Sequence, residues 1–221
     1  MPVKDECRDI LLPRVMEAFS MDGCPVCRLA SKAEEDFLES LLYERVNTQW
    51  AWRLMTQSNG LCRYHAWRIA ELTSSKPVLD ALGPTILYKH VLEKDQRERN
   101  DREAECPVCR ETCSYIVMVS RWMAGCFDKS FEFIEHYRKG RSLFCINHYR
   151  LVVSNMRNSD KIRTLEKVQE EKLNRLKHSL NEYIRKKSHD VMEPITEEEA
   201  NAWLNAIWYL KGDRSFRQCG L

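Results

Sequence analysis

The sequence predicts an all-α fold of two pseudo-repeated helical halves, each organised around a CxxC…CxxH metal site, with a C-terminal helical extension. Apolar residues recur at helical spacing along much of the 221-residue chain. Glycine and proline number only 7 each, which is few for a β-sandwich or barrel that turns about every ten residues. The word Cys-Pro-Val-Cys-Arg occurs at residues 24–28 and again at 106–110, which indicates an internal duplication.

The first half is expected to contain several short helices. Apolar residues from Ile10 to Phe19 share one face of a helix that ends near Gly23, and a wider stripe follows the first CPVCR word as far as Leu42. An aromatic segment then leads into a further helix that begins at His65. We expect Trp50 and Trp52 of that segment to be buried around the first metal site.

The second half repeats this order. A helix over residues 115–123 follows the second CPVCR word, and an aromatic segment over residues 131–137 precedes Cys145 and His148. Phe131 and Phe133 are expected to be buried around the second site. The expected domains are residues 1–82 (first half with the N-terminal helix), 83–105 (charged connecting helix), 106–157 (second half) and 158–221 (C-terminal helices packing on the core).

Two helices are expected in the C-terminal extension. A polar helix over residues 161–187 carries an apolar row that includes Leu173, Leu176 and Leu180. Thr196 and Glu199 form a capping-box pattern that opens the last helix. The apolar residues expected to face inward from this last helix are Trp203, Leu204, Ile207 and Trp208.

The cysteine and histidine spacing predicts two metal sites. In each half a CxxC pair is followed 35 or 36 positions later by a CxxH pair. Zinc takes four ligands in a tetrahedron, so two such pairs complete one coordination shell. The expected ligands are Cys24, Cys27, Cys62 and His65 for the first site, and Cys106, Cys109, Cys145 and His148 for the second. Cys113, four positions after Cys109, is an alternative to His148 as the fourth ligand of the second site.

Two zinc ions are the favoured cofactors, and other interpretations of the same residues remain open. Three cysteines and a histidine can also hold an iron–sulfur cluster. Each CPVC word can act as a redox dithiol, although the strand that normally precedes a thioredoxin-type motif is missing from the pattern. The cysteines can also be ordinary residues of a helical core.

Composition and the absence of known motifs exclude several classes of function. Lys and Arg total 35 against 33 for Asp and Glu, so no overall basic field favours nucleic acid. No run of 18 apolar residues predicts a membrane span, and the N-terminal residues lack the apolar region of a signal peptide. We therefore expect a cytoplasmic protein whose ten cysteines remain reduced.

A non-enzymatic role is favoured by the same sequence. No serine-nucleophile, phosphate-loop or dinucleotide motif is present, and a zinc ion with four protein ligands has no open position for substrate. The favoured interpretation is a zinc-stabilised interaction or adaptor module whose partner is another, unidentified protein. The alternative is a redox, iron–sulfur or metal-handling protein that uses the CPVC thiolates.

The motifs together resemble an uncharacterised bacterial family of cysteine-rich helical proteins. The resemblance rests on the paired CPxCR words, the LCxxHxxR block at residues 61–68, the segment from Phe37 to Tyr43 and the block from Leu82 to Tyr88. It extends over almost the whole chain. The resemblance implies a helical, duplicated, cytoplasmic bacterial protein and supplies no reaction.

Overall fold

The computed structural model describes residue 7, residues 10–93 and residues 105–213. Those residues form helices and connecting loops with no β-strand, so the all-α prediction is confirmed. The chain divides into two compact units: an inserted unit of residues 32–115, and a discontinuous unit of residues 1–31 and 116–221. These boundaries differ from the expected limits at residues 82 and 106, which followed the sequence repeat. The charged connector lies largely at 94–104, outside the described residues.

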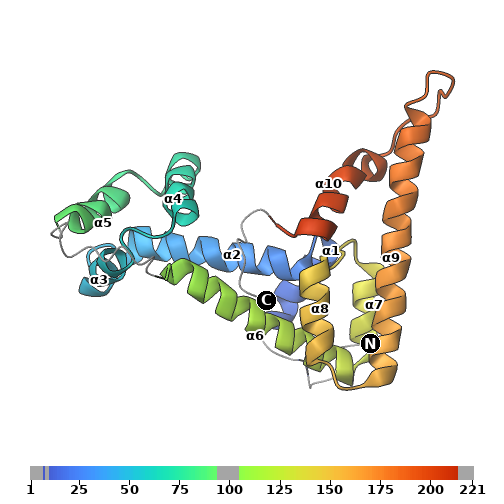
Figure 1. Ribbon diagram of the computed structural model, residues 1–221, viewed down its shortest axis with the longest axis horizontal. Helices are drawn as coiled ribbons and strands as arrows, with labels where there is room; N and C mark the ends of the chain where they lie inside the picture. The colour runs from blue at the N-terminus through green and yellow to red at the C-terminus, as the bar shows by residue number, and fades with distance from the viewer. Residues whose placement is uncertain (1–6, 8–9, 94–104, 214–221) are drawn as a thin grey trace. The chain divides into compact units, whose positions relative to one another are not determined.

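Two helices contribute residues to both units, α2 (Pro25–Glu39) and α6 (Pro107–Lys129). The inserted unit also contains the π-helical turn η2 (Ser40–Glu44), α3 (Gln49–Gln57), α4 (Arg63–Ser75) and α5 (Leu82–Glu93), which are labelled in Figure 1 except for η2. Helix α5 packs against α3 and η2. The apolar core of this unit includes Leu38, Leu41, Met55, Ile69, Leu72 and Leu87.

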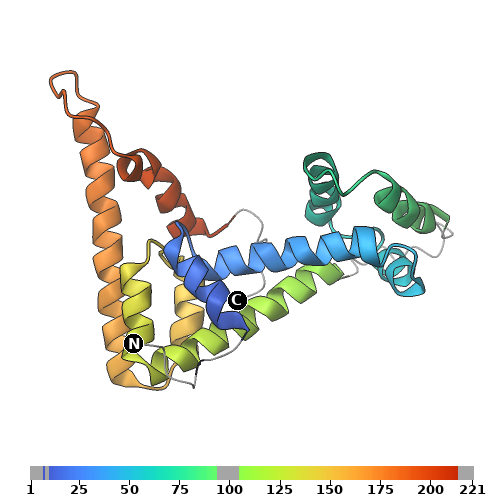
Figure 2. The same cartoon turned by 180° about the vertical axis from the view of Figure 1, so that it is seen from behind.

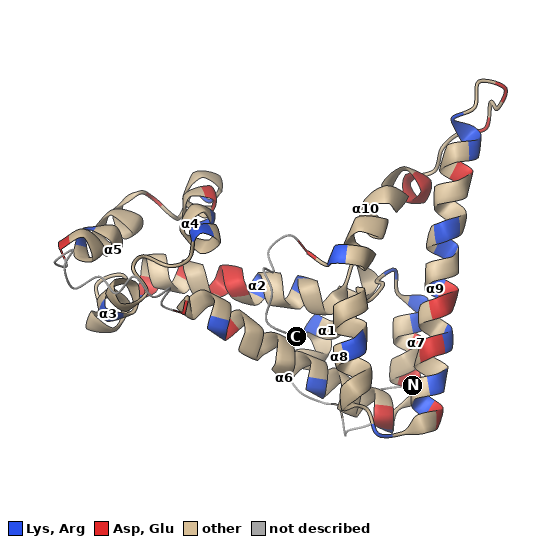
Figure 3. Ribbon diagram, in the orientation of Figure 1, with Lys and Arg blue, Asp and Glu red and all other residues tan. Residues whose placement is uncertain are grey.

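The discontinuous unit contains α1 (Leu11–Ser20), α7 (Phe131–Lys139), α8 (Ile146–Asn155), α9 (Ser159–Lys186) and α10 (Glu197–Lys211). Figure 2 shows α7 beside one end of the long helix α9 and α10 nearer the other end of α9. Helix α1 packs against α7, and α8 packs against α10. Basic and acidic residues are interspersed along α9 (Figure 3). The polar helix expected over 161–187 is confirmed as α9.

A buried aromatic cluster organises the discontinuous unit. The rings of Phe19, Phe127, Phe133, Tyr137 and Phe144 contact one another, with the closest centroids 4.8 Å apart. The Tyr137 hydroxyl donates to Gln169 Oε1 at 2.6 Å and accepts from the Phe144 backbone N–H at 3.1 Å. These bonds satisfy the one polar group of the cluster, as burial requires. The cluster fixes α7 and the segment before Cys145 against α1.

Two of the four aromatic side chains expected to be buried are exposed instead. Phe133 is buried and Trp52 is half-buried, but Phe131 and Trp50 are exposed. Phe131 is the first residue of α7 and Trp50 is the second residue of α3, so the segments expected to be aromatic connectors are amphipathic helices with one outward face.

The face of α10 was also predicted incorrectly. Trp203 and Ile207 are 55% and 47% exposed, and Leu204 and Trp208 are only half-buried. The side of α10 that packs on the leucine row of α9 presents Ala202 and Ala206 instead. Small residues let the two helices approach closely there. The half-buried Tyr209 also packs against this row, while Trp203 and Ile207 lie outside it.

Candidate metal centres

The eight predicted ligands form two clusters, but the predicted grouping is wrong. The structure joins the first CxxC pair to the second CxxH pair, and the second CxxC pair to the first CxxH pair. The first CxxC pair meets the second CxxH pair because backbone hydrogen bonds join two segments that are distant in the sequence. Ser142 N–H donates to the Phe19 carbonyl at 3.1 Å, and Leu143 N–H donates to the Gly23 carbonyl at 3.0 Å. These bonds hold Cys145 beside Cys24.

Gly140 is required for this connection. A Cβ atom at position 140 would lie 2.1 Å from the Phe19 carbonyl oxygen, so only glycine allows the two segments to approach. The approach of residues 19–24 to residues 140–145 therefore depends on a long-range contact that no local sequence motif reveals.

All four motifs use the same local structure. In each one the first cysteine caps a helix, accepting the first helical hydrogen bond on its carbonyl, and the second ligand lies three residues later in the first turn. The capping positions are Cys24, Cys62, Cys106 and Cys145. This geometry places both side chains of a motif at the helix N-terminus, where the backbone dipoles favour negatively charged thiolates.

Site 1, in the discontinuous unit, consists of Cys24, Cys27, Cys145 and His148. His148 Nδ1 lies 3.5, 3.2 and 3.3 Å from the three sulfur atoms, in that residue order, and the sulfurs of Cys27 and Cys145 are 3.9 Å apart. All four residues are buried. Cys113, considered as an alternative to His148, lies in neither cluster. It is disulfide-bonded, so the expectation that all ten cysteines remain reduced is wrong.

Site 2, in the inserted unit, consists of Cys62, His65, Cys106 and Cys109. His65 Nδ1 lies 3.2 Å from the sulfur of Cys62 and 3.4 Å from each of the other two, and the sulfurs of Cys62 and Cys109 are 3.8 Å apart. Cys62 and Cys109 are only half-buried, which makes site 2 the more accessible of the two clusters.

These distances fit one tetrahedral ion in each cluster. Bonds of about 2.3 Å from zinc to sulfur and 2.0–2.1 Å to nitrogen imply sulfur–sulfur separations of about 3.8 Å and sulfur–nitrogen separations of about 3.6 Å. The observed separations are 3.8–3.9 Å and 3.2–3.5 Å. A disulfide would require a sulfur–sulfur distance of about 2.0 Å, so these cysteines are unbridged.

The three thiols of each cluster influence one another's ionisation. In site 1, hydrogen bonds from Cys24 and Cys27 hold the pKa of Cys145 far below its ordinary value, while hydrogen bonding to Cys145 and Cys24 raises that of Cys27. In site 2, burial opposes ionisation of Cys106, but the hydrogen bond with His65 and those with the backbones of Cys109 and Cys62 together outweigh it, and the pKa of Cys106 falls to about 6. Converging thiols cannot all ionise without a compensating cation, which is the electrostatic condition for a metal site.

A buried carboxylate lies behind the histidine of site 2. Glu34 Oε2 is 3.7 Å from His65 Nε2, and neither atom has a hydrogen-bond partner among the described residues. The other oxygen of Glu34 accepts from the Tyr64 hydroxyl at 3.3 Å and lies 3.8 Å from Arg68 Nε. A ligating histidine commonly donates its second ring N–H to a carboxylate. The position of the Glu34 carboxylate behind His65 Nε2 therefore fits a metal bound to Nδ1.

The end of the last helix closes over site 1. Asp213 N–H donates to the sulfur of Cys27 at 3.4 Å. Gly212, with a φ of 73°, makes the turn that brings this N–H to the sulfur. Sequence analysis missed both this donor and Glu34. Glu34 stands in the acidic run Glu34-Glu35-Asp36, where nothing distinguishes it from a solvated side chain.

The fold and the clusters define a helical protein with two Cys₃His sites able to bind metal ions. The chain is 22% identical over 209 residues to an "uncharacterized 23.9 kDa protein in xynA 3′ region" from Caldicellulosiruptor sp. (strain Rt8B.4). The alignment covers 90% of this chain and 99% of that protein. No family model matches the chain, and no solved structure matches it. Within the described residues, every helix is too short or too polar to cross a bilayer.

Proposed function

We propose that the chain binds two structural zinc ions and that these ions stabilise a helical protein without catalytic activity of its own. The observation that supports this most directly is the convergence of four sulfur and nitrogen atoms, all within 4.8 Å of one another, in each of two clusters. Each cluster supplies a full set of four ligands, so a bound ion has no open position for water or substrate.

The position of the ligands in the chain supports a stabilising role. Cys24 and His148 are 124 residues apart, and Cys62 and Cys109 are 47 residues apart. An ion that joins such distant segments restricts the unfolded chain and ties metal binding to folding.

Elemental analysis of the purified protein, with an absorption spectrum, tests the metal. We expect two zinc ions per chain and a colourless solution, and we expect a chelator to lower the melting temperature. A brown protein that contains iron and absorbs near 400 nm would replace this proposal with the iron–sulfur alternative. A folded protein without bound metal would refute it.

The second part of the proposal is that the protein acts in the cytoplasm as an adaptor for another protein. The metal-binding cysteines are unbridged, as a reducing compartment favours, although Cys113 forms a disulfide. Helix α10 exposes Trp203, Ile207 and Leu210, which are 55%, 47% and 56% exposed and lie at helical spacing. An exposed apolar row of this kind is typical of a protein-binding surface.

A surface variant tests this part. Trp203→Glu combined with Ile207→Glu should retain helicity and both metal ions, but lose any protein that co-purifies in stoichiometric amount with the wild type. Lys177→Glu on the exposed side of α9 is the control and should retain that protein. An identical set of co-purifying proteins for all three forms would contradict the adaptor role.

A further inference from the structure

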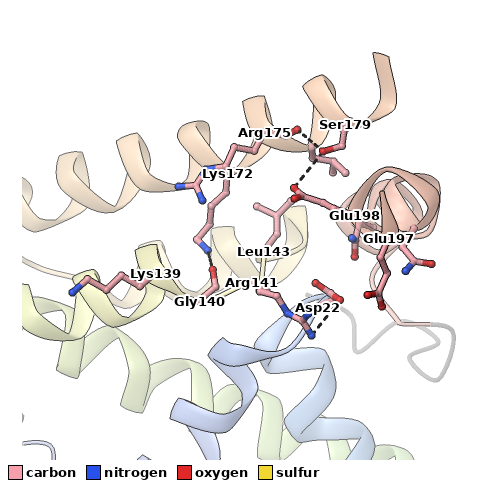
Figure 4. Close-up of a pocket in the computed structure, with 13 residues that line it drawn as sticks. Asp22, Lys139, Gly140, Arg141, Leu143, Lys172, Arg175, Ser179, Glu197 and Glu198 are labelled. Atoms are coloured by element: carbon pink, nitrogen blue, oxygen red, sulfur yellow. Dashed lines mark hydrogen bonds and ion pairs between the residues drawn. The ribbon is translucent and has the colours of Figure 1, made fainter. Parts of the chain in front are cut away.

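The discontinuous unit contains a cleft that the metal sites do not use. Its volume is about 360 Å³, within the lower part of the range typical of small-molecule sites. Figure 4 shows its walls: helix α9 on one side, the first turns of α10 on another, and the segment 139–143 with Asp22 below. No cysteine or histidine lines it.

The cleft is positive at one end. Lys139, Lys172 and Arg175 lie together there, to one side of Leu143 (Figure 4). Lys172 is only 6% exposed; its ammonium donates to the Gly140 carbonyl and lies 4.7 Å from the centre of the Tyr137 ring. Within the described residues, the side chains of Lys139 and Arg175 form no ion pair, so both can bind an anion.

The other end of the cleft is negative. Glu197 and Glu198, in the first turn of α10, face Asp22 across it (Figure 4). Asp22 pairs with Arg141 at 3.6 Å, and Glu198 accepts from the Ser179 hydroxyl at 3.3 Å. Glu197 makes no ion pair to any described residue, so its carboxylate remains available to a cation.

The floor between the two ends is apolar. Leu143 lies there (Figure 4) and packs with Leu176 of α9, and the amides of Asn201 and Asn205 add hydrogen-bond donors and acceptors to the lining. A simple anion that filled this cleft would meet the carboxylates, and a simple cation would meet the ammonium and guanidinium groups. Only a ligand with both charges, separated by an aliphatic spacer, matches all three parts.

We propose that this cleft binds a small zwitterion, with its anionic group against Lys172 and Arg175 and its ammonium group against Glu197. The anionic group is a carboxylate or a phosphate, both of which suit a paired lysine and arginine. The aliphatic part lies on Leu143 and Leu176. This inference is independent of the metal proposal, because none of the cleft residues belongs to either cluster.

Calorimetric titration of the full-length, metal-loaded protein tests the inference with three matched probes. These are 5-aminopentanoate, pentanoate without the ammonium group, and pentylamine without the carboxylate. We expect 5-aminopentanoate to bind at least tenfold more tightly than either singly charged probe. Titration with 3-aminopropyl phosphate then identifies the preferred anion, since tighter binding than 5-aminopentanoate assigns a phosphate and weaker binding a carboxylate.

Two variants identify the ends of the cleft. Arg175→Ala should remove the advantage of 5-aminopentanoate over pentylamine, and Glu197→Ala should remove its advantage over pentanoate. Arg163→Ala is the control, because Arg163 is an exposed arginine on the same helix that pairs with Asp160 at 2.8 Å and lies outside the cleft. Equal binding of the three probes, no binding of any zwitterion at 10 mM, or the same loss in Arg163→Ala would overturn the inference.

Discussion

Replacing Glu34 by Gln should weaken metal binding at site 2 and leave site 1 unchanged. Glutamine keeps the size of the side chain and an oxygen that can accept from Tyr64, but removes the negative charge 3.7 Å from His65 Nε2. When Nδ1 binds a metal, Nε2 carries the proton and gains positive charge, and the carboxylate stabilises that state. The variant therefore isolates the electrostatic contribution of Glu34.

The magnitude follows from the distance. Two unit charges 3.7 Å apart interact by about 4.5 kcal/mol at an effective dielectric constant of about 20. The imidazole of a bound histidine carries only part of a unit charge, and Arg68, 3.8 Å from Glu34, already offsets some of the carboxylate's effect. A loss of about 1.4–2.7 kcal/mol remains, which corresponds to a ten- to hundredfold lower affinity.

Competition between the protein and a zinc chelator, followed as two binding steps, measures this change. Glu35→Gln is the matched control, because Glu35 pairs with Arg68 and Lys76 and forms no ion pair with His65. We expect one step to move in Glu34→Gln and neither step to move in Glu35→Gln. Equal shifts of both steps, or the same shift in the two variants, would refute the role assigned to Glu34.

Three further predictions concern the ligand grouping, a buried lysine and a constrained glycine. Combining Cys24→Ser with His148→Ala should remove one metal ion per chain, and combining Cys24→Ser with His65→Ala should remove two; elemental analysis giving the reverse pattern would restore the grouping expected from the sequence. Burial, with Arg175 nearby, lowers the pKa of Lys172 from 10.5 to about 8, so its charged form destabilises the fold below pH 8 and this effect disappears as the pH rises towards 10.5. The unfolding free energy of the wild type, measured against Lys172→Met by denaturant titration, should therefore increase by up to about 3 kcal/mol between pH 7 and pH 10.5, and a pH-independent difference would contradict it. Gly212→Ala should destabilise the discontinuous unit by about 1–3 kcal/mol, because a φ of 73° with a ψ of −166° is available almost only to glycine; an unchanged thermal transition would show that the turn is not constrained.

The local features of the fold could be predicted from the sequence. Thr196 and Glu199 form the expected capping box, with the Thr196 hydroxyl accepting from the Glu199 N–H and the Glu199 carboxylate accepting from the Thr196 N–H. The residue types that converge in the two clusters were also identifiable, because CxxC and CxxH spacing fits one helical turn. Both signals arise from interactions between residues three or four positions apart.

The grouping of the ligands could not be predicted from spacing. Either CxxC pair can complete a tetrahedron with either CxxH pair, since all four motifs present their ligands from the same kind of helix start. Which pairs meet is determined by the backbone hydrogen bonds from residues 142 and 143 to residues 19 and 23, and by the close approach at Gly140. The exposed side of α10 escaped prediction for a similar reason: helical spacing identifies an apolar row, but only the partner helix determines whether Trp203 or Ala202 enters the contact.

The exchanged grouping has a consequence for the protein while the ribosome is still making it. Cys24, Cys27, Cys62 and His65 leave the ribosome before any later ligand, and they have the composition and spacing of a complete zinc site. A nascent chain that captured an ion with this early set would hold a non-native cross-link, which must be released when Cys106 and Cys109 emerge. Site 2 can then form, whereas site 1 must wait for Cys145 and His148. Free zinc during translation is therefore expected to favour a kinetic trap, and a chain refolded from its full length should avoid it.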